Sequence, residues 1–191
     1  MKTAYALFLI LFAFNFSFTL IGQRYYTLKE ARNLPKDSVL YLKVSRKRLT
    51  QIPSEVFIFK NLKGLDLSKN KLVTISPMIE KFSMLEKLNL SKNRFEVFPK
   101  ELVRLENLRE LILGSNQLEY IPKSISKYPK LEELDMYDNP IGDLGDGIFS
   151  ITTLRKLDLR GLMYNAKSQA EIRNRLPNVK VLFDPPCNCI D

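Results

Sequence analysis

The sequence repeats itself with a period of 23 residues, and this period constrains the fold more than any other feature. Similar segments begin at residues 62, 85, 108 and 131, so the spacing does not vary across these four units. One step back reaches a further unit at Val39, and one step forward reaches another at Leu154. A constant period of this length is typical of proteins built from stacked repeats, so we expect a solenoid.

Seven positions in each unit explain why the units must stack. Positions 1, 4, 6, 11, 14, 18 and 21 are apolar in all five complete units. Positions 4 and 6 alternate with solvent-facing positions, as in a half-buried strand. Positions 11 to 21 have the spacing of a helical or 3-10 segment. A single strand and its return segment cannot enclose these side chains, so neighbouring units must bury them, with parallel strands about 4.8 Å apart.

Position 9 is asparagine in the four central units. The chain turns there, and the backbone groups of the turn cannot all pair within the sheet. An amide side chain both donates and accepts hydrogen bonds, so a stacked column of asparagines is expected to satisfy them. The column consists of Asn70, Asn93, Asn116 and Asn139. Lys47 and Leu162 hold the equivalent places in the end units, where one neighbour is missing.

These residues resemble the leucine-rich repeat family, whose pattern is L-x-x-L-x-L-x-x-N-x-L. The second unit shows the pattern at Leu62, Leu65, Leu67, Asn70 and Leu72. The resemblance covers about residues 39–164, and pairs such as Ile52-Pro53 are similar to the short typical and bacterial subclasses. It implies an α/β horseshoe solenoid with a parallel sheet on the concave face and short helical or 3-10 segments on the convex face. It also implies a binding role, because family members mostly bind proteins.

The sequence before the repeats indicates an export signal. Lys2 precedes an uncharged run over residues 4–14, and a small residue, Gly22, precedes the expected start of the mature chain. We therefore expect residues 1–22 to be a signal peptide that is cleaved after Gly22. Residues 3–22 are also long enough to span a bilayer, so an uncleaved anchor remains the alternative. No stable membrane insertion is expected after cleavage.

Both ends of the array need a cover, because a terminal repeat exposes an apolar side. Residues 23–38 are expected to form a helical N-terminal cap, opened by a capping box of Thr27 and Glu30 and closed by Pro35. Six units then fill residues 39–164.

Residues 165–191 are expected to form a helix-strand cap at the other end. An amphipathic helix over residues 167–176 would turn Ala170, Ile172 and Leu176 inward. A seventh, irregular strand would follow near Val181 and join the sheet.

Two cysteines, Cys187 and Cys189, lie in the tail. In an exported chain they would meet oxidising conditions and form a tight local disulfide or a bond to another chain. A redox or metal dithiol is the alternative, although no third metal-ligand type is nearby.

Composition excludes several classes of function. The chain has no histidine, which removes Ser-His-Asp and Cys-His nucleophile pairs and every histidine metal site. We expect no enzyme activity, no cofactor and no metal. The net charge is +9, from 30 Lys and Arg against 21 Asp and Glu. The acids dilute this charge, and dedicated nucleic-acid binders concentrate theirs on one face, so no nucleic-acid partner is expected.

The solvent-facing positions on and beside the strands are polarised along the array. Units one to three carry nine cations and two acids there, whereas units four to six carry four cations and six acids. Exposed aromatic or apolar residues ringed by charge are typical interface anchors. The candidate partner-binding residues are Tyr41, Lys69, Asn89, Lys92, Ile112, Asp135, Tyr137 and Arg160. The alternative is a solvated face on which the large side chains of Ile112 and Tyr137 are incidental.

The sequence thus predicts an exported, non-enzymatic module that binds a protein, or else an acidic surface polymer, on its concave face. The Gly22-Gln23 junction and the Cys-x-Cys tail resemble those of small exported bacterial repeat proteins. This resemblance implies a secreted, periplasmic or cell-surface location. A secreted effector or adhesin directed at a host is the main alternative.

Overall fold

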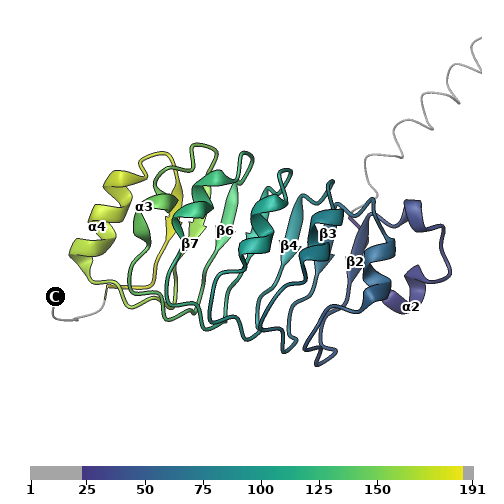
Figure 1. Ribbon diagram of the computed structural model, residues 1–191. Coiled ribbons are helices and arrows are strands. Elements are labelled where there is room, and N and C mark those ends of the chain that lie inside the picture. Colours follow the sequence, from purple (N-terminus) through teal and green to yellow (C-terminus); the bar gives the residue numbers. More distant parts are fainter. Residues whose placement is uncertain (1–22, 187–191) are drawn as a thin grey trace, which may run out of the picture.

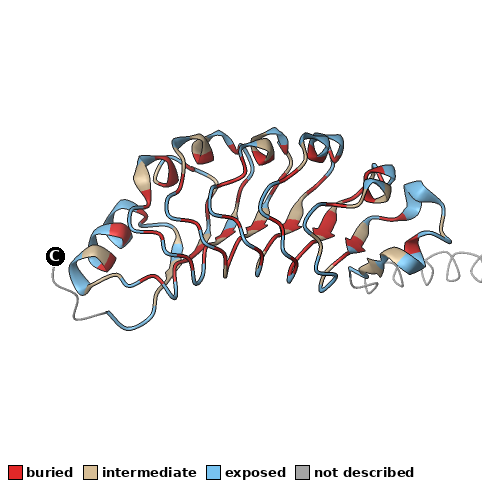
Figure 2. Cartoon of the chain, turned by 60° about the horizontal axis from the view of Figure 1, so that its bottom comes forward, coloured by how far each residue is buried: buried red, intermediate tan, exposed pale blue. Residues whose placement is uncertain are grey.

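The computed structural model describes residues 23–186 of the 191-residue chain. The expected signal peptide and the pair Cys187 and Cys189 therefore lie outside the described residues. Eight parallel strands form one sheet whose order follows the chain, and helical segments lie along its other side (Figure 1). The strands line the inner side of an arc and the helical segments its outer side (Figure 2). This is the α/β solenoid that the repeat predicts.

The strands are short because each unit contributes only the stretch around positions 3 to 5. They are β1 (Tyr26–Thr27), β2 (Tyr41–Lys43), β3 (Gly64–Asp66), β4 (Lys87–Asn89), β5 (Glu110–Ile112), β6 (Glu133–Asp135), β7 (Lys156–Asp158) and β8 (Lys180–Leu182). From β2 to β7, every residue pairs with the residue 23 positions later, as Leu65 does with Leu88. The period of the sequence is therefore the register of the sheet.

Short helices return the chain along the convex side. They are η3 (Ser54–Ile58), η4 (Pro77–Lys81), η5 (Lys100–Arg104), η6 (Lys123–Lys127) and α3 (Gly145–Ile148), and α4 (Ala166–Arg175) follows the last repeat. The four η segments are 3-10 helices, and each begins at or just after a proline. Proline suits this place because its φ fits the first turn and because no N–H is left unpaired there.

The core lies between the sheet and the convex helices. Every apolar position of the five complete units is buried except that of Leu49, which is partly exposed in the first unit. One such buried side chain contributes about 1.5–3 kcal/mol, so neighbouring units stabilise one another mainly through this layer. The column of asparagines adds a polar layer beside it.

Each of these asparagines joins two units. In Asn93, Nδ2 donates to the carbonyl oxygen of Leu90 in its own unit at 2.8 Å and to that of Leu67 in the preceding unit at 3.1 Å. Its Oδ1 accepts from the N–H of Leu72 at 3.1 Å. Equivalent bonds are made by Asn70, Asn116 and Asn139. The column connects one turn to the next along the array.

The N-terminal cap contains a strand as well as a helix. Strand β1 pairs with β2, so the sheet has eight strands rather than the seven expected from the repeats and the C-terminal cap. The extra strand covers the backbone edge that β2 would otherwise expose. The predicted capping box of Thr27 and Glu30 opens helix α2 (Leu28–Ala31). The helix ends earlier than expected, and Pro35 instead precedes the 3-10 turn η2 (Lys36–Ser38).

At the other end, α4 and β8 cover the last repeat. Ile172 and Leu176 are buried as expected, but the expectation for Ala170 is wrong, because this residue is exposed and Gln169 is buried instead. The Nε2 of Gln169 donates to two backbone carbonyls, including that of Asp184 at 3.1 Å. These bonds satisfy the amide, which is why a polar side chain can replace alanine under the cap.

Candidate partner-binding surface

Ion pairs cross the concave face from strand to strand. The Nζ of Lys87 lies 3.1 Å from a carboxylate oxygen of Glu110 on the next strand. Further pairs join Lys43 to Asp66, Lys63 to Glu86, Arg109 to Glu132, and Lys156 to Glu133. Exposed pairs of this kind contribute about 0–1 kcal/mol each. Their main effect is that much of the charge on the sheet itself is neutralised.

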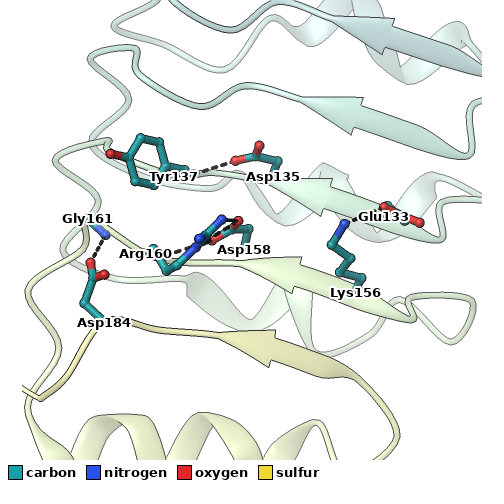
Figure 3. Close-up of polar contacts among 8 residues, drawn as sticks. All are labelled: Glu133, Asp135, Tyr137, Lys156, Asp158, Arg160, Gly161 and Asp184. Carbon is teal, nitrogen blue, oxygen red and sulfur yellow. Dashed lines mark hydrogen bonds and ion pairs between the residues drawn. The ribbon is translucent and has the colours of Figure 1, made fainter.

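Five of the eight candidate residues lie together on this face, from its middle toward its C-terminal end. Asn89, Ile112 and Asp135 are direct neighbours, because the register pairs Asn89 with Ile112 and Ile112 with Asp135. Tyr137 and Arg160 follow β6 and β7, and the guanidinium carbon of Arg160 lies 5.9 Å from the centre of the Tyr137 ring. These five residues are referred to below as the C-terminal patch. Figure 3 shows Asp135, Tyr137 and Arg160 on the two neighbouring chain segments.

Asp158 holds Arg160 in place. Its buried carboxylate accepts hydrogen bonds from Nε of Arg160 at 2.9 Å and from Nη2 at 2.5 Å (Figure 3). Burial alone would raise the pKa of Asp158, but the hydrogen bonds from Arg160 outweigh it, so the pKa lies below its ordinary value. The Arg160 side chain remains 49% exposed, so a fixed guanidinium is presented to solvent.

Asp135 lies half-buried beside this ion pair. Burial raises the pKa of its carboxyl, the N–H of Tyr137 opposes the rise by donating at 2.8 Å, and the charge of Asp158 adds to it. A hollow of about 60 Å³ lies next to Asp135, lined in part by Ile112 and Lys156. This volume is well below the roughly 300–1,000 Å³ of a typical small-molecule site.

The structure places Tyr41 away from the patch, near the other end of the sheet. Its ring packs against Tyr25, with the ring centres 5.3 Å apart. A Cβ at Gly64 would stand 2.5 Å from the Tyr41 ring and 2.7 Å from the Tyr25 hydroxyl, so glycine is what lets both rings lie there. Burial, assisted by the carboxylates of Glu110 and Asp66, raises the pKa of Tyr25 to about 12.

The remaining two candidates, Lys69 and Lys92, lie in the turns that follow β3 and β4. Both are exposed and have positive φ, 57° and 56°. The same left-handed conformation recurs at position 8 of all six units, ending with Gly161. It costs a residue with a Cβ about 1–2 kcal/mol. These lysines thus lie in the turns at the carboxyl ends of the strands and do not belong to the C-terminal patch.

Two residues that shape this surface are absent from the sequence-based candidates. Asp158 is one period after Asp135 and two residues before Arg160, and this spacing is the signal that could have marked it as the partner of the arginine. Tyr25 precedes the repeats, so the period carries no information about it. Its signal is indirect: Gly64 is the one glycine at position 3 of the six units.

Within residues 23–186, no group of three or more Asp, Glu, His or Cys side chains is arranged to hold a metal ion. None of the helices in that part of the chain combines the length and the apolar character needed to cross a bilayer.

Comparison with known proteins gives one family. The family model described as leucine rich repeat matches residues 38–95 and 83–141. A leucine-rich repeat protein of Leptospira interrogans has a similar structure, with a TM-score of 0.59 and 31% identity over 77% of this chain and 43% of that chain. Internalin C2 of Listeria monocytogenes has a TM-score of 0.63 and 24% identity over 82% of this chain and 66% of that chain, and at this identity the likeness shows the fold alone.

The chain therefore spans less than half of the Leptospira protein and about two thirds of the internalin. No curated protein sequence matches it at a significant level.

Proposed function

The chain belongs to the leucine-rich repeat family, and from this premise we propose that it is an exported binding module whose C-terminal patch recognises a protein. The observation that carries the proposal is the pairing of a large exposed aromatic ring with a fixed guanidinium. The Tyr137 ring is 42% exposed, and Arg160 is held beside it by Asp158.

The composition of the C-terminal patch supports this role. Tyrosine and arginine are the residue types that most often dominate the energetics of protein interfaces, and Ile112 adds apolar contact area beside them. Because Asp158 fixes Arg160 before a partner arrives, less side-chain entropy is lost on association. The patch extends across the neighbouring segments of β4 to β7, which suits a protein better than a small molecule, which would need a deeper pocket.

The test is a comparison of two double variants of the full chain in a pull-down from surface-protein extracts. The patch variant is Ile112→Ala with Tyr137→Ala. The control variant is Val73→Ala with Val97→Ala, two exposed apolar residues away from the patch that are 54% and 57% exposed. Proteins retained by the wild type and by the control, and lost from the patch variant, are the expected result, because an aromatic anchor at an interface contributes about 2 kcal/mol or more.

Equal retention by the wild type and both variants would overturn the patch as the binding site. Urea denaturation of each variant separates a lost contact from a lost fold. The expected magnitude for a single partner is a loss of at least thirtyfold in affinity, the equivalent of about 2 kcal/mol.

Export is the second part of the proposal, and it rests on the sequence of residues 1–22. Recovery of the chain from the culture medium with Gln23 at its amino terminus would support cleavage and secretion. Retention of the whole chain in the membrane fraction would favour the uncleaved anchor instead. An effector or adhesin role is the alternative, and extracts of host-type cells as the source of partners would distinguish it from a role at the bacterial surface.

A further inference from the structure

The turns at the carboxyl ends of strands β2 to β4 carry a block of seven cations. Three of them occupy position 8 and three occupy position 10 of successive units, and Lys47 lies between the rows. The block consists of Arg46, Lys47, Arg48, Lys69, Lys71, Lys92 and Arg94. All seven are exposed, and none forms an ion pair with another described residue. This block is referred to below as the cationic edge.

The backbone aligns these charges in rows. Arg46, Lys69 and Lys92 share the left-handed conformation, with φ of 58°, 57° and 56°. The strands before them pair in register, so equivalent residues follow one another at about the 4.8 Å spacing of the strands. Two unit charges about 5 Å apart repel by roughly 1 kcal/mol in water before salt screening. The rows therefore oppose folding slightly unless an anion lies across them.

The backbone itself gives no reason for cations at position 8. A left-handed residue is least costly as Gly or Asn. The later units use Ser115, Asp138 and Gly161 at this place, which shows that the turn forms without a positive charge. Three cations in succession at a conformationally unfavourable position thus need another explanation, and contact with a polyanion provides it.

Beyond the third unit, positions 8 and 10 carry no cation, and Asp138 is the one charged residue among them. A hollow of about 420 Å³ lies there, lined among others by Ser115, Gln117, Asp138 and Asn139. Its lining offers hydroxyl, amide and carboxylate groups. A molecule that runs along the whole edge would thus place anionic groups on units one to three and hydroxyl groups in this hollow.

We propose that the edge binds a linear anionic polysaccharide, with its sulfate or carboxylate groups on the cationic edge and its hydroxyls in the neighbouring hollow. Arg46, Arg48 and Arg94 can each hold such a group with two parallel hydrogen bonds. Single-stranded nucleic acids are held largely by stacking on aromatic rings, which the cations, hydroxyls and amides of this edge do not provide. The site shares no residue with the C-terminal patch, although Asp138 and Gly161 of the hollow are the chain neighbours of Tyr137 and Arg160. The edge variant and the patch variant therefore test the two proposals independently.

The test measures binding of the full chain to heparin fragments, as the sulfated probe, and to polygalacturonate, as the carboxylated one. The edge variant is Lys69→Asn, Lys92→Asn and Arg94→Gln; asparagine suits the left-handed conformation, so the turns are kept. The control variant is Lys60→Gln, Lys81→Gln and Lys100→Gln, which removes the same charge from exposed lysines elsewhere. Urea denaturation confirms that both variants are folded.

We expect the edge variant to lose at least tenfold in affinity for one or both polysaccharides at 0.15 M salt, and the control to change less than threefold. The slope of log affinity against log salt concentration should fall by about 2 to 3 in the edge variant, close to one for each cation removed. Binding of heparin but not of polygalacturonate would identify sulfate as the group that the site recognises. Binding of both probes would show that the site recognises anionic groups in general.

Three results would overturn the proposal. One is an equal loss in the edge and control variants, which would mean that only the net charge matters. Another is wild-type binding to neither probe. The third is binding of single-stranded DNA or polyglutamate, at matched charge concentration, as tight as that of the polysaccharides. The patch variant Ile112→Ala with Tyr137→Ala should keep full polysaccharide affinity.

Discussion

Units one to three and units four to six have the same backbone and opposite surfaces. In both halves the strands pair one period apart, and in units two to five a buried asparagine joins the turn to the one before. The first half presents the cationic edge, together with the contacting rings of Tyr25 and Tyr41. The second presents Ile112, Tyr137 and a clamped arginine among acids. The comparison teaches that one set of positions builds the scaffold and a different set carries contacts, so the two can vary independently.

The largest expected effect concerns the shared scaffold. Asn70→Ala in the first half and Asn139→Ala in the second should each lower the free energy of unfolding by about 2–4 kcal/mol, because each leaves several buried backbone groups without a partner. Urea denaturation measures both losses, with Gln117→Ala as an exposed control expected within about 0.5 kcal/mol of the wild type. A loss confined to one half would show that the scaffolds are not equivalent.

A second prediction addresses the first half alone. Gly64→Ala should lower the free energy of unfolding by about 1–3 kcal/mol, because the new methyl group meets the Tyr41 ring and the Tyr25 hydroxyl. Gly142→Ala is the matched control, since nothing lies within 4 Å of its added Cβ. Thermal or urea unfolding compares the two. Equal stability of both variants would mean that the tyrosines move aside freely and that their packing is not specific.

The smallest predicted effect concerns the second half and depends on pH. The native pKa of Asp158 lies below its unfolded value, near 3.9, so its carboxylate contributes stability above that value and loses it as the pH falls through the native pKa. Asp158→Asn should therefore cost about 1–2 kcal/mol at pH 7, and the gap from the wild type should narrow as the pH falls through the native pKa of Asp158. Urea midpoints between pH 2.5 and pH 7 measure it.

The control for this pH series is Asp138→Asn. Asp138 is exposed and lies in a left-handed turn that asparagine also adopts readily. Its stability should stay within about 0.5 kcal/mol of the wild type across the range. If the stability difference between Asp158→Asn and the wild type does not change with pH, the ion pair of Asp158 with Arg160 is not its cause.

The scaffold was predictable from sequence because it depends on local and periodic rules. The apolar positions give the strands and the convex helices, and the pair Thr27 and Glu30 gives the first helix. Strand β1 was not predictable in this way, because it lies outside the period and pairs with β2 only through its backbone. Gln169 was also missed, since its burial depends on carbonyls brought from other segments by the tertiary fold.

The surface was less predictable than the scaffold, although the sequence contains information about ion pairs that a count of charged residues does not use. Counting charges shows an excess of cations in the first half, but it does not show which are paired. The pairs Lys87–Glu110 and Lys156–Glu133 are both one period apart, so the 23-residue period is enough to identify them. What the period does not provide is side-chain direction in the turns. This is why the hydrogen bonds from Arg160 to Asp158 were not predicted.

The constant register also determines how such a chain can change in length. Each strand is paired on both sides from β2 to β7, so one extra residue in a unit must be absorbed by that unit's own loops or it displaces every later contact. Duplication or loss of a complete 23-residue unit, in contrast, preserves all pairings on either side. The gene can therefore lengthen or shorten by whole units with little disturbance, and a unit gained or lost between units three and five would change the distance from the cationic edge to Tyr137 and Arg160 by one strand spacing.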